Sequence, residues 1–280
     1  MGGKSKQKKV GQEPSAETIV VVLPGDDVTE RILSANDNNK LPKLGLGLQY
    51  NPNTRRVKVT LAGRLDENHS TKTWLVWQNA KRYLPAVEDR VLVVVEERIG
   101  SDGSGGDLFR VNMHGPHPGT LSNLDFEGAT KRNKPALQLG MLLYARISTV
   151  YRRGIMDPVL SCQIGPRDAG ASRKDWMTNE GTYGELKGGT VQRVSLGLAR
   201  ELLQPNNVVL TELANHKIAF ELAVGVNGLL WVHSTHPQYT TLIQNAIQNS
   251  EVLTEPHVRG MVKSLFYTVQ KQMQQDADHD

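Results

Sequence analysis

The chain is short of the residues that cross-link, activate or anchor a protein. Its 280 residues include one cysteine, Cys162, and only 5% aromatic residues. A single cysteine excludes an internal disulfide framework and any Cys-x-x-Cys zinc or redox motif, and it fits a reducing compartment. No apolar run approaches the roughly 18 residues that cross a bilayer. The lysine-rich N-terminus is followed by no apolar stretch, so we expect neither membrane attachment nor a secretory signal.

Active-site motifs are missing as well. The sequence contains no Gly-x-x-x-x-Gly-Lys-Ser/Thr phosphate loop and no Gly-x-Ser-x-Gly nucleophile turn. The glycine-rich stretch 100–106 precedes a predicted strand, whereas a phosphate cradle needs a helix N-terminus. The pairs His114/His117 and His233/His236 have no cysteine or carboxylate cluster beside them to complete a zinc site. We therefore expect no catalytic residue, no metal and no cofactor.

Two acidic pairs keep an enzyme open as an alternative. Asp26 with Asp27, and Asp125 with Glu127, could hold a divalent metal for nuclease chemistry. Each pair lies beside a predicted turn, where acidic side chains commonly bond the backbone, so the turn interpretation is favoured. Cys162 lies in a predicted strand and is interpreted as a small buried apolar residue.

Hydrophobic periodicity predicts an α+β multidomain protein. Before residue 84 strands are expected, such as Val57–Leu61, and no helical period is present. The next 80 or so residues hold five short strands, among them Leu108–Met113 and Leu139–Ile147, which suits a small OB-type β-barrel. The expected divisions are a disordered basic arm at 1–17, a small β domain at 18–83, the barrel at 84–165, an α/β domain at 166–270 and an acidic tail at 271–280.

The α/β domain is predicted to follow the order β-α-α-β-β-α-α. Ser195 is expected to cap a helix that Pro205 ends, and further helices are expected at 241–249 and 256–269. Asn227-Gly228 between two apolar runs predicts a hairpin. We expect a type I′ turn there, with positive φ at both residues.

Positive charge gathers in two places, and the net charge is +4. The lysines of residues 4–9 form a basic arm, which suits a polyanion partner, a nuclear address or simply a solvated end. Lys131, Arg132 and Lys134 lie in a loop between two predicted barrel strands. Such loops bind single-stranded nucleic acid in OB folds, and cations there neutralise phosphates. A solvated charged loop is the alternative interpretation.

Four runs of residues carry a family resemblance. They are Val22–Asp26, Lys81–Pro85, Leu124–Pro135 with the following Gln138–Gly140, and Gly225–Val232. In this order, over residues 18–270, they resemble exosome component three, the family of ribosomal-RNA-processing S1/KH cap subunits of the eukaryotic RNA exosome. The resemblance implies an N-terminal β domain, an S1 domain with an OB fold and a C-terminal KH domain.

A non-catalytic subunit is what this resemblance implies. Such caps stabilise a ring of RNase PH-like subunits together with other cap subunits. They guide single-stranded RNA to a separate 3′→5′ exoribonuclease for RNA processing and decay, in the nucleus and nucleolus with a cytoplasmic pool. The expected RNA contacts are Lys131, Arg132, Asn133 and Lys134 in the loop, with Arg110, Arg146 and Tyr144 facing outward from the barrel. The expected structural or interface residues are Gly25, Gly225, Asn227, Gly228 and Trp231.

Both domain patterns are incomplete in this chain. Phe109 is predicted to face the core, which leaves Tyr144 as the only aromatic residue for base stacking on the barrel. The Gly-x-x-Gly clamp of a KH domain is replaced by Gln204-Pro205-Asn206-Asn207. We therefore expect weak, sequence-tolerant guidance of RNA. The other S1/KH cap subunit and a free-standing RNA-binding protein are the alternatives.

Overall fold

The computed structural model describes residues 20–34, 42–68, 73–78, 80–151, 156–168, 174–178, 181–216 and 218–277. The predicted basic arm at 1–17 lies outside these residues. The chain forms two compact units, Met1–Asn79 and Ala80–Asp280, and each is described by itself. In the described part of the chain, no helix has the length and apolar character needed to cross a membrane.

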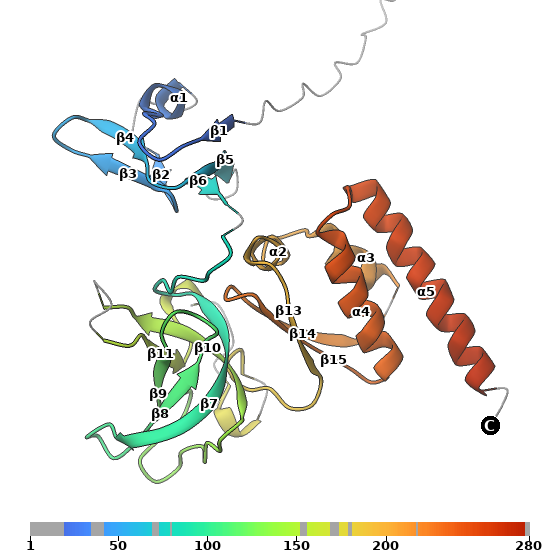
Figure 1. Ribbon diagram of the computed structural model, residues 1–280. Helices are drawn as coiled ribbons and strands as arrows, with labels where there is room; N and C mark the ends of the chain where they lie inside the picture. The colour runs from blue at the N-terminus through green and yellow to red at the C-terminus, as the bar shows by residue number, and fades with distance from the viewer. Residues whose placement is uncertain are drawn as a thin grey trace, which may run out of the picture. The chain divides into compact units, whose positions relative to one another are not determined.

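The first unit is built on small β-sheets (Figure 1). A four-stranded sheet has the order β1-β5-β6-β2, and β3 pairs with β4. The element bounds are β1 Val20–Val22, α1 Thr29–Ser34, β2 Lys43–Leu44, β3 Leu48–Asn51, β4 Arg56–Val59, β5 Gly63–Asn68 and β6 Thr73–Trp77. Its core consists of apolar side chains from these elements, including Val22, Ile32, Val57, Val59 and Val76.

Helix α1 corrects the expectation that no helix precedes residue 84. It is a short helix of 6 residues with one buried side chain, Ile32, so it has no apolar period to detect. Asp27 starts it, because its carboxylate accepts the N–H of Thr29 at 3.0 Å. Gly25 precedes it with φ of 100°, a left-handed conformation that glycine adopts without strain.

The second unit begins with a closed five-stranded barrel (Figure 1). Its strands are β7 Arg90–Ser101, β8 Asp107–Asn112, β9 Gly119–Phe126, β10 Leu142–Thr149 and β11 Val159–Cys162. Neighbouring strands are antiparallel except β9 and β11, and the pairing of β10 with β11 closes the barrel. Alternate residues such as Val91, Val93, Val111, Leu121 and Leu143 fill its core.

The start of β10 differs from the prediction. Leu139 was expected to begin this strand and point inward, but its exposed fraction is 68%. Gly140 has φ of 84°, which turns the chain before Leu142 enters the sheet. The alternation of apolar residues runs through this turn, so periodicity alone extended the strand too far.

A connecting segment and an α/β domain follow the barrel. The connection contains the short 3-10 helices η2 Pro166–Asp168 and η3 Trp176–Thr178, and β12 Gly184–Glu185, which pairs with β10. The remaining elements are β13 Thr190–Arg193, α2 Leu196–Leu202, α3 Val208–Asn215, β14 Phe220–Gly225, β15 Leu229–Ser234, α4 Pro237–Ser250 and α5 Glu255–Ala277. This is the predicted β-α-α-β-β-α-α order. The sheet order is β13-β15-β14.

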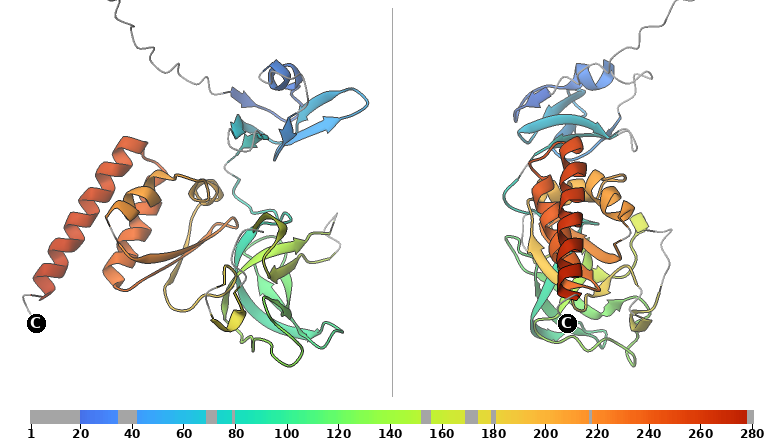
Figure 2. Two further views of the ribbon diagram at one scale, coloured as in Figure 1. Left: turned by 180° about the vertical axis from the view of Figure 1, so that it is seen from behind. Right: turned by 90° about the vertical axis from the view of Figure 1, so that its right-hand side faces the viewer.

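Helices cover one face of this sheet, and α5 packs on α3 and α4 farther from it (Figures 1 and 2). Ser195 caps α2 as expected, since its hydroxyl oxygen accepts the N–H of Leu198 at 3.1 Å. Helix α2 ends at Leu202, shortly before Pro205. Helix α5 continues to Ala277, beyond the residue 269 that apolar spacing indicated.

The hairpin between β14 and β15 has a different turn from the one predicted. Gly225 pairs with Leu229, so three residues form the connection, and the Gly228 N–H donates to the Gly225 carbonyl at 3.0 Å. Gly228 has φ of 79°, whereas Asn227 is not among the described residues with positive φ. The type I′ expectation is therefore wrong. A three-residue connection with a left-handed glycine at its end leaves the Asn227 side chain available for long-range contacts.

Candidate nucleic-acid interface

The basic loop of the barrel presents two cations on a tight turn. The Thr130 N–H donates to the Asn133 carbonyl at 2.7 Å, and the Asn133 N–H donates back to Thr130 at 3.1 Å. Lys131 and Arg132 lie between these bonds with exposed side chains. Within the described residues, neither has an ion-pair partner. Their charges are therefore available to an external anion.

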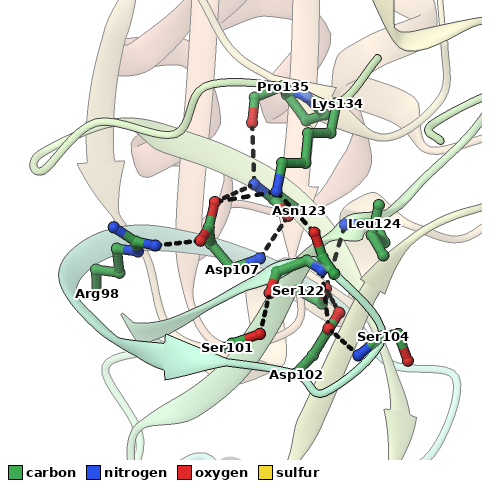
Figure 3. A network of polar contacts seen from close by, with 12 residues as sticks. Arg98, Ser101, Asp102, Ser104, Asp107, Ser122, Asn123, Leu124, Lys134 and Pro135 are labelled. Atoms are coloured by element: carbon green, nitrogen blue, oxygen red, sulfur yellow. Dashed lines mark hydrogen bonds and ion pairs between the residues drawn. The ribbon is translucent and has the colours of Figure 1, made fainter. Parts of the chain in front are cut away.

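Lys134 lies in a different environment (Figure 3). Its Nζ donates to the Gly105 carbonyl at 2.8 Å and lies 3.3 Å from a carboxylate oxygen of Asp107. Only 27% of its side chain is exposed. These bonds fasten the basic loop to the β7–β8 hairpin and restrain the Lys134 side chain, and the phosphate contact expected of Lys134 stays a prediction.

Asp107 organises this attachment. It accepts bonds from Arg98 and Lys134, and from Asn123 Nδ2 at 3.1 Å. Asn123 is 2% exposed, and its Oδ1 accepts the Asp107 N–H at 2.8 Å. Loss of water around the Asp107 carboxylate raises its pKa, but the bonds from these three side chains outweigh that effect and lower the pKa overall.

A second acid, Asp102, orders the glycine-rich connection (Figure 3). The Ser122 hydroxyl donates to it at 2.6 Å, and the N–H groups of Ser104 and Gly106 donate at 2.7 and 2.9 Å. These bonds, led by the one from Ser122, lower the pKa of Asp102. Residues 102–106 thus form the hairpin connection between β7 and β8, while Gly100 and Ser101 belong to β7.

Sequence reasoning missed this network of Asp102, Asp107, Ser122 and Asn123. The available signal was weak: Asp, Asn and Ser near a glycine-rich turn are common in any loop. Pairing of β7 with β8, and of β8 with β9, is what brings these side chains together across the barrel.

Tyr144 and Arg146 lie on the outer barrel face as expected, but neither side chain is open to solvent. Tyr144 is 8% exposed, and its hydroxyl donates to the Val224 carbonyl at 3.0 Å. Burial raises the pKa of Tyr144 to about 12. The Arg146 side chain is 13% exposed, and its Nη1 donates to Glu88 at 2.8 Å. The alternation put both on the outer barrel face, but other parts of the second unit cover that face.

Arg110 and Asn133 stay closer to the prediction. Arg110 is paired with Glu97 on the neighbouring strand, and 41% of its side chain is exposed. Asn133 is exposed beside the two free cations, with Nδ2 3.4 Å from the Met177 sulfur. Of the expected RNA contacts, only Lys131, Arg132 and Asn133 form one exposed surface.

The hairpin turn joins the α/β domain to the barrel. Asn227 is 5% exposed. Its Nδ2 donates to the carbonyls of Leu92 and Met113 at 2.7 and 2.8 Å. A Cβ on Gly225 would lie 2.9 Å from the Leu92 nitrogen, so the close approach requires glycine.

Trp231 is a buried residue of the sheet in the same region. It is 4% exposed, and its indole N–H donates to the Gly188 carbonyl at 2.8 Å.

The segment that replaces the Gly-x-x-Gly clamp also has a structural role. Asn207 caps α3 by accepting the N–H groups of Val209 and Leu210 at 3.1 and 3.2 Å.

Asp26 and Asp27 are bonded within their own turn and first unit, and Glu127 is bonded to a distant backbone group. Asp26 accepts the Leu23 N–H at 2.8 Å, and Asp27 binds Thr29 and Arg56. Glu127 accepts the Ile164 N–H at 3.2 Å. No group of three or more His, Cys, Asp or Glu side chains in the described residues could hold a metal.

The lone cysteine is buried, as expected. Burial raises the pKa of the Cys162 thiol, which leaves it without thiolate character.

The fold and its basic loop define a protein with an S1 domain followed by a KH domain. Residues 83–170 match the family model for the S1 domain of exosome complex component RRP40, and residues 189–238 match a KH domain model. This confirms the predicted fold class.

Full-length relatives give the family. Exosome complex component rrp40 of Schizosaccharomyces pombe is 33% identical over 87% of this chain and 95% of its own length. Exosome complex component RRP40 of Drosophila melanogaster is 32% identical over 84% and 90%. The human protein of that name is 32% identical over 71% and 67%. The chain belongs to the family of exosome complex component RRP40.

Proposed function

We propose that this chain is the RRP40 subunit of an RNA exosome, a non-catalytic S1/KH cap that guides single-stranded RNA. In this role it stabilises a ring of RNase PH-like subunits beside other caps, and it directs RNA toward a separate 3′→5′ exoribonuclease for RNA processing and decay. The proposed location is the nucleus and nucleolus, with a cytoplasmic pool. The family membership of the chain supports this assignment.

One observation supports the RNA-guiding role most directly. Lys131 and Arg132 are exposed at the tip of a bonded turn and have no ion-pair partner in the described chain. Cations held in this way attract phosphates without reading bases, so binding is expected to be sequence-tolerant and to weaken with salt.

The RNA role is tested with the double variant Lys131→Ala/Arg132→Ala in the full chain. We expect weaker binding to single-stranded RNA and a shallower salt dependence, with the slope of log K against log salt reduced by about 1.4 for two lost phosphate contacts. The matched control is Arg259→Ala/Lys263→Ala, which removes two exposed cations of α5. Equal effects of the two double variants would contradict a specific basic loop.

Assembly is tested by the native mass of the tagged chain from its own cells, with the co-purifying proteins identified. A large particle containing RNase PH-like subunits is expected. A particle near the 31.0 kDa of the single chain would instead favour a free-standing RNA-binding protein. Incubation of the purified chain with labelled RNA and Mg²⁺ or Mn²⁺ tests the nuclease alternative, and no degradation is expected.

A further inference from the structure

A pocket of about 430 Å³ lies in the second unit where the barrel, the connecting segment and the α/β domain meet. We propose that it receives one unstacked nucleobase of the RNA strand whose phosphates contact Lys131 and Arg132, and that it favours bases carrying an amino group. This proposal rests on the proposed function and adds base selection to it. The volume lies within the usual range for pockets that bind small ligands.

Aromatic side chains line the pocket and are held in place by hydrogen bonds. Tyr144 and Tyr183 lie against each other with ring centroids 5.5 Å apart and ring planes tilted by 31°. Tyr144 is bonded to Val224, and the Tyr183 hydroxyl donates to Asp168 at 2.5 Å. Trp231 is bonded to the Gly188 carbonyl. These walls are therefore largely formed before a ligand enters, and flat aromatic surfaces are what proteins offer to unstacked bases.

The pocket wall is bonded to the basic loop. The backbone N–H of Trp176 donates to the Glu127 carbonyl at 3.1 Å, and the Met177 sulfur lies 3.4 Å from Asn133 Nδ2, next to the free cations. Both Trp176 and Met177 line the pocket, and Met177 is 60% exposed. A strand held by phosphates at Lys131 and Arg132 thus has an aromatic pocket beside it, and a flexible methionine can adjust to the base.

Polar groups on the lining favour particular base edges. Glu185 and Glu221 line the pocket, and their carboxylates accept hydrogen bonds only. Adenine, cytosine and guanine carry exocyclic amino donors, whereas uracil carries none. The Lys187 Nζ lies 3.5 Å from a carboxylate oxygen of Glu185, whereas the Glu221 carboxylate has no hydrogen bond or ion pair among the residues that the structure describes.

These carboxylates also argue for the occupant. They would repel a phosphate but accept an uncharged base, while the phosphates remain at the external cations. An indole N–H on the wall, that of Trp176, is buried and has no acceptor among the described residues. The wall therefore contains a polar group that the protein itself does not satisfy.

The test measures binding of the full chain to a labelled oligouridine and to the same oligomer with one central cytidine. The cytidine oligomer is expected to bind several-fold more tightly, since one stacked and hydrogen-bonded base is involved. The variant Ala136→Trp places a large ring at an exposed position of the lining and is expected to abolish this preference. Leu139→Trp, at an exposed position outside the lining, is the control and should preserve it.

A second variant tests the hydrogen bond without filling the pocket. Glu221→Gln keeps the size of an exposed side chain and removes its charge, so the cytidine preference should fall while oligouridine binding changes little. In contrast, Lys131→Ala/Arg132→Ala should weaken both oligomers and preserve their ratio.

The outcomes separate the two proposals. Equal binding of both oligomers, with normal sensitivity to the Lys131 and Arg132 changes, would overturn the base pocket and leave RNA guidance standing. Loss of a partner protein from the complex of Ala136→Trp, with RNA preference unchanged, would also overturn it in favour of a protein ligand. No measurable RNA binding by the wild-type chain or its complex would contradict RNA guidance itself.

Discussion

Asn227 and Leu92 exchange two hydrogen bonds across the junction of the KH and S1 domains. The Asn227 Nδ2 donates to the Leu92 carbonyl at 2.7 Å, and its Oδ1 accepts the Leu92 N–H at 3.3 Å. The next residue toward the N-terminus, Val226, adds a bond from its N–H to the Arg90 carbonyl at 2.9 Å. One side-chain amide and one backbone N–H of the hairpin turn thus bond the backbone of a barrel strand, and these bonds tie the two domains together.

Replacing Asn227 with alanine should destabilise this junction. The change removes the bonds to Leu92 and Met113 and leaves buried backbone groups unpaired, at a cost of about 3 kcal/mol. Urea unfolding of the full chain measures the loss. Asn215→Ala removes the side chain of an exposed asparagine at the end of α3 and should change the free energy of unfolding much less. Similar losses in both variants would show that the junction is not stabilising.

Replacement by alanine should have opposite effects at Gly228, in the same turn, and at Gly260, in α5. Gly228→Ala forces a side chain into φ of 79° and places its Cβ 2.9 Å from the Val194 carbonyl oxygen, so stability should fall by about 2 kcal/mol. Gly260→Ala lies in α5, where no atom lies within 4 Å of the added Cβ, and should stabilise by up to about 1 kcal/mol. Thermal unfolding of the pair tests this, and unaltered stability of Gly228→Ala would refute the strain argument.

Lys134 and Lys131 should behave differently although they are three positions apart. Lys134→Ala removes the bonds to Gly105 and Asp107 and should lower the melting temperature while disordering the basic loop. Lys131→Ala should leave the melting temperature unchanged and weaken RNA binding alone, because its charge has no partner in the described chain. Calorimetry with RNA titrations on both variants measures the difference. If both variants lost only RNA affinity, Lys134 would be a phosphate contact after all.

The bonds of Asp102 should make the stability of the fold depend on pH in the acid range. Its pKa lies below the usual 3.8 in the folded chain, first because of the bond from Ser122. Its contribution to stability is therefore complete above that usual value and is lost as the pH falls through the lower folded pKa. Asp102→Asn should remove this part of the pH dependence, as measured by urea unfolding from about pH 6 to about pH 2. The exposed control Glu251→Gln should retain it.

Local patterns in the sequence were enough for most of the fold. Alternating apolar residues predicted the barrel strands, and Ser195 and Pro205 predicted the limits of α2. Helix α1 was missed because one buried side chain, Ile32, forms no period. The start of β10 was misplaced because Gly140 interrupts the backbone without interrupting the alternation of side chains.

The site was only partly predictable. Three cations in one loop are visible in the sequence, but Lys134 forms an ion pair with Asp107, which lies 27 positions away and is brought close by strand pairing. Tyr144 and Arg146 alternate with core residues, and a sequence pattern cannot show that a second domain or a buried acid will cover the outer face.

Secondary structure, the order of the domains and the location of the basic loop follow from residues close together in the chain, because periodicity, caps and turn residues act over a few positions. Contacts between distant segments decide which charges stay free and which aromatic rings are buried. They also decide where a pocket opens. Those contacts follow from packing, as the bonds of Asn227 to Leu92 and of Tyr144 to Val224 illustrate.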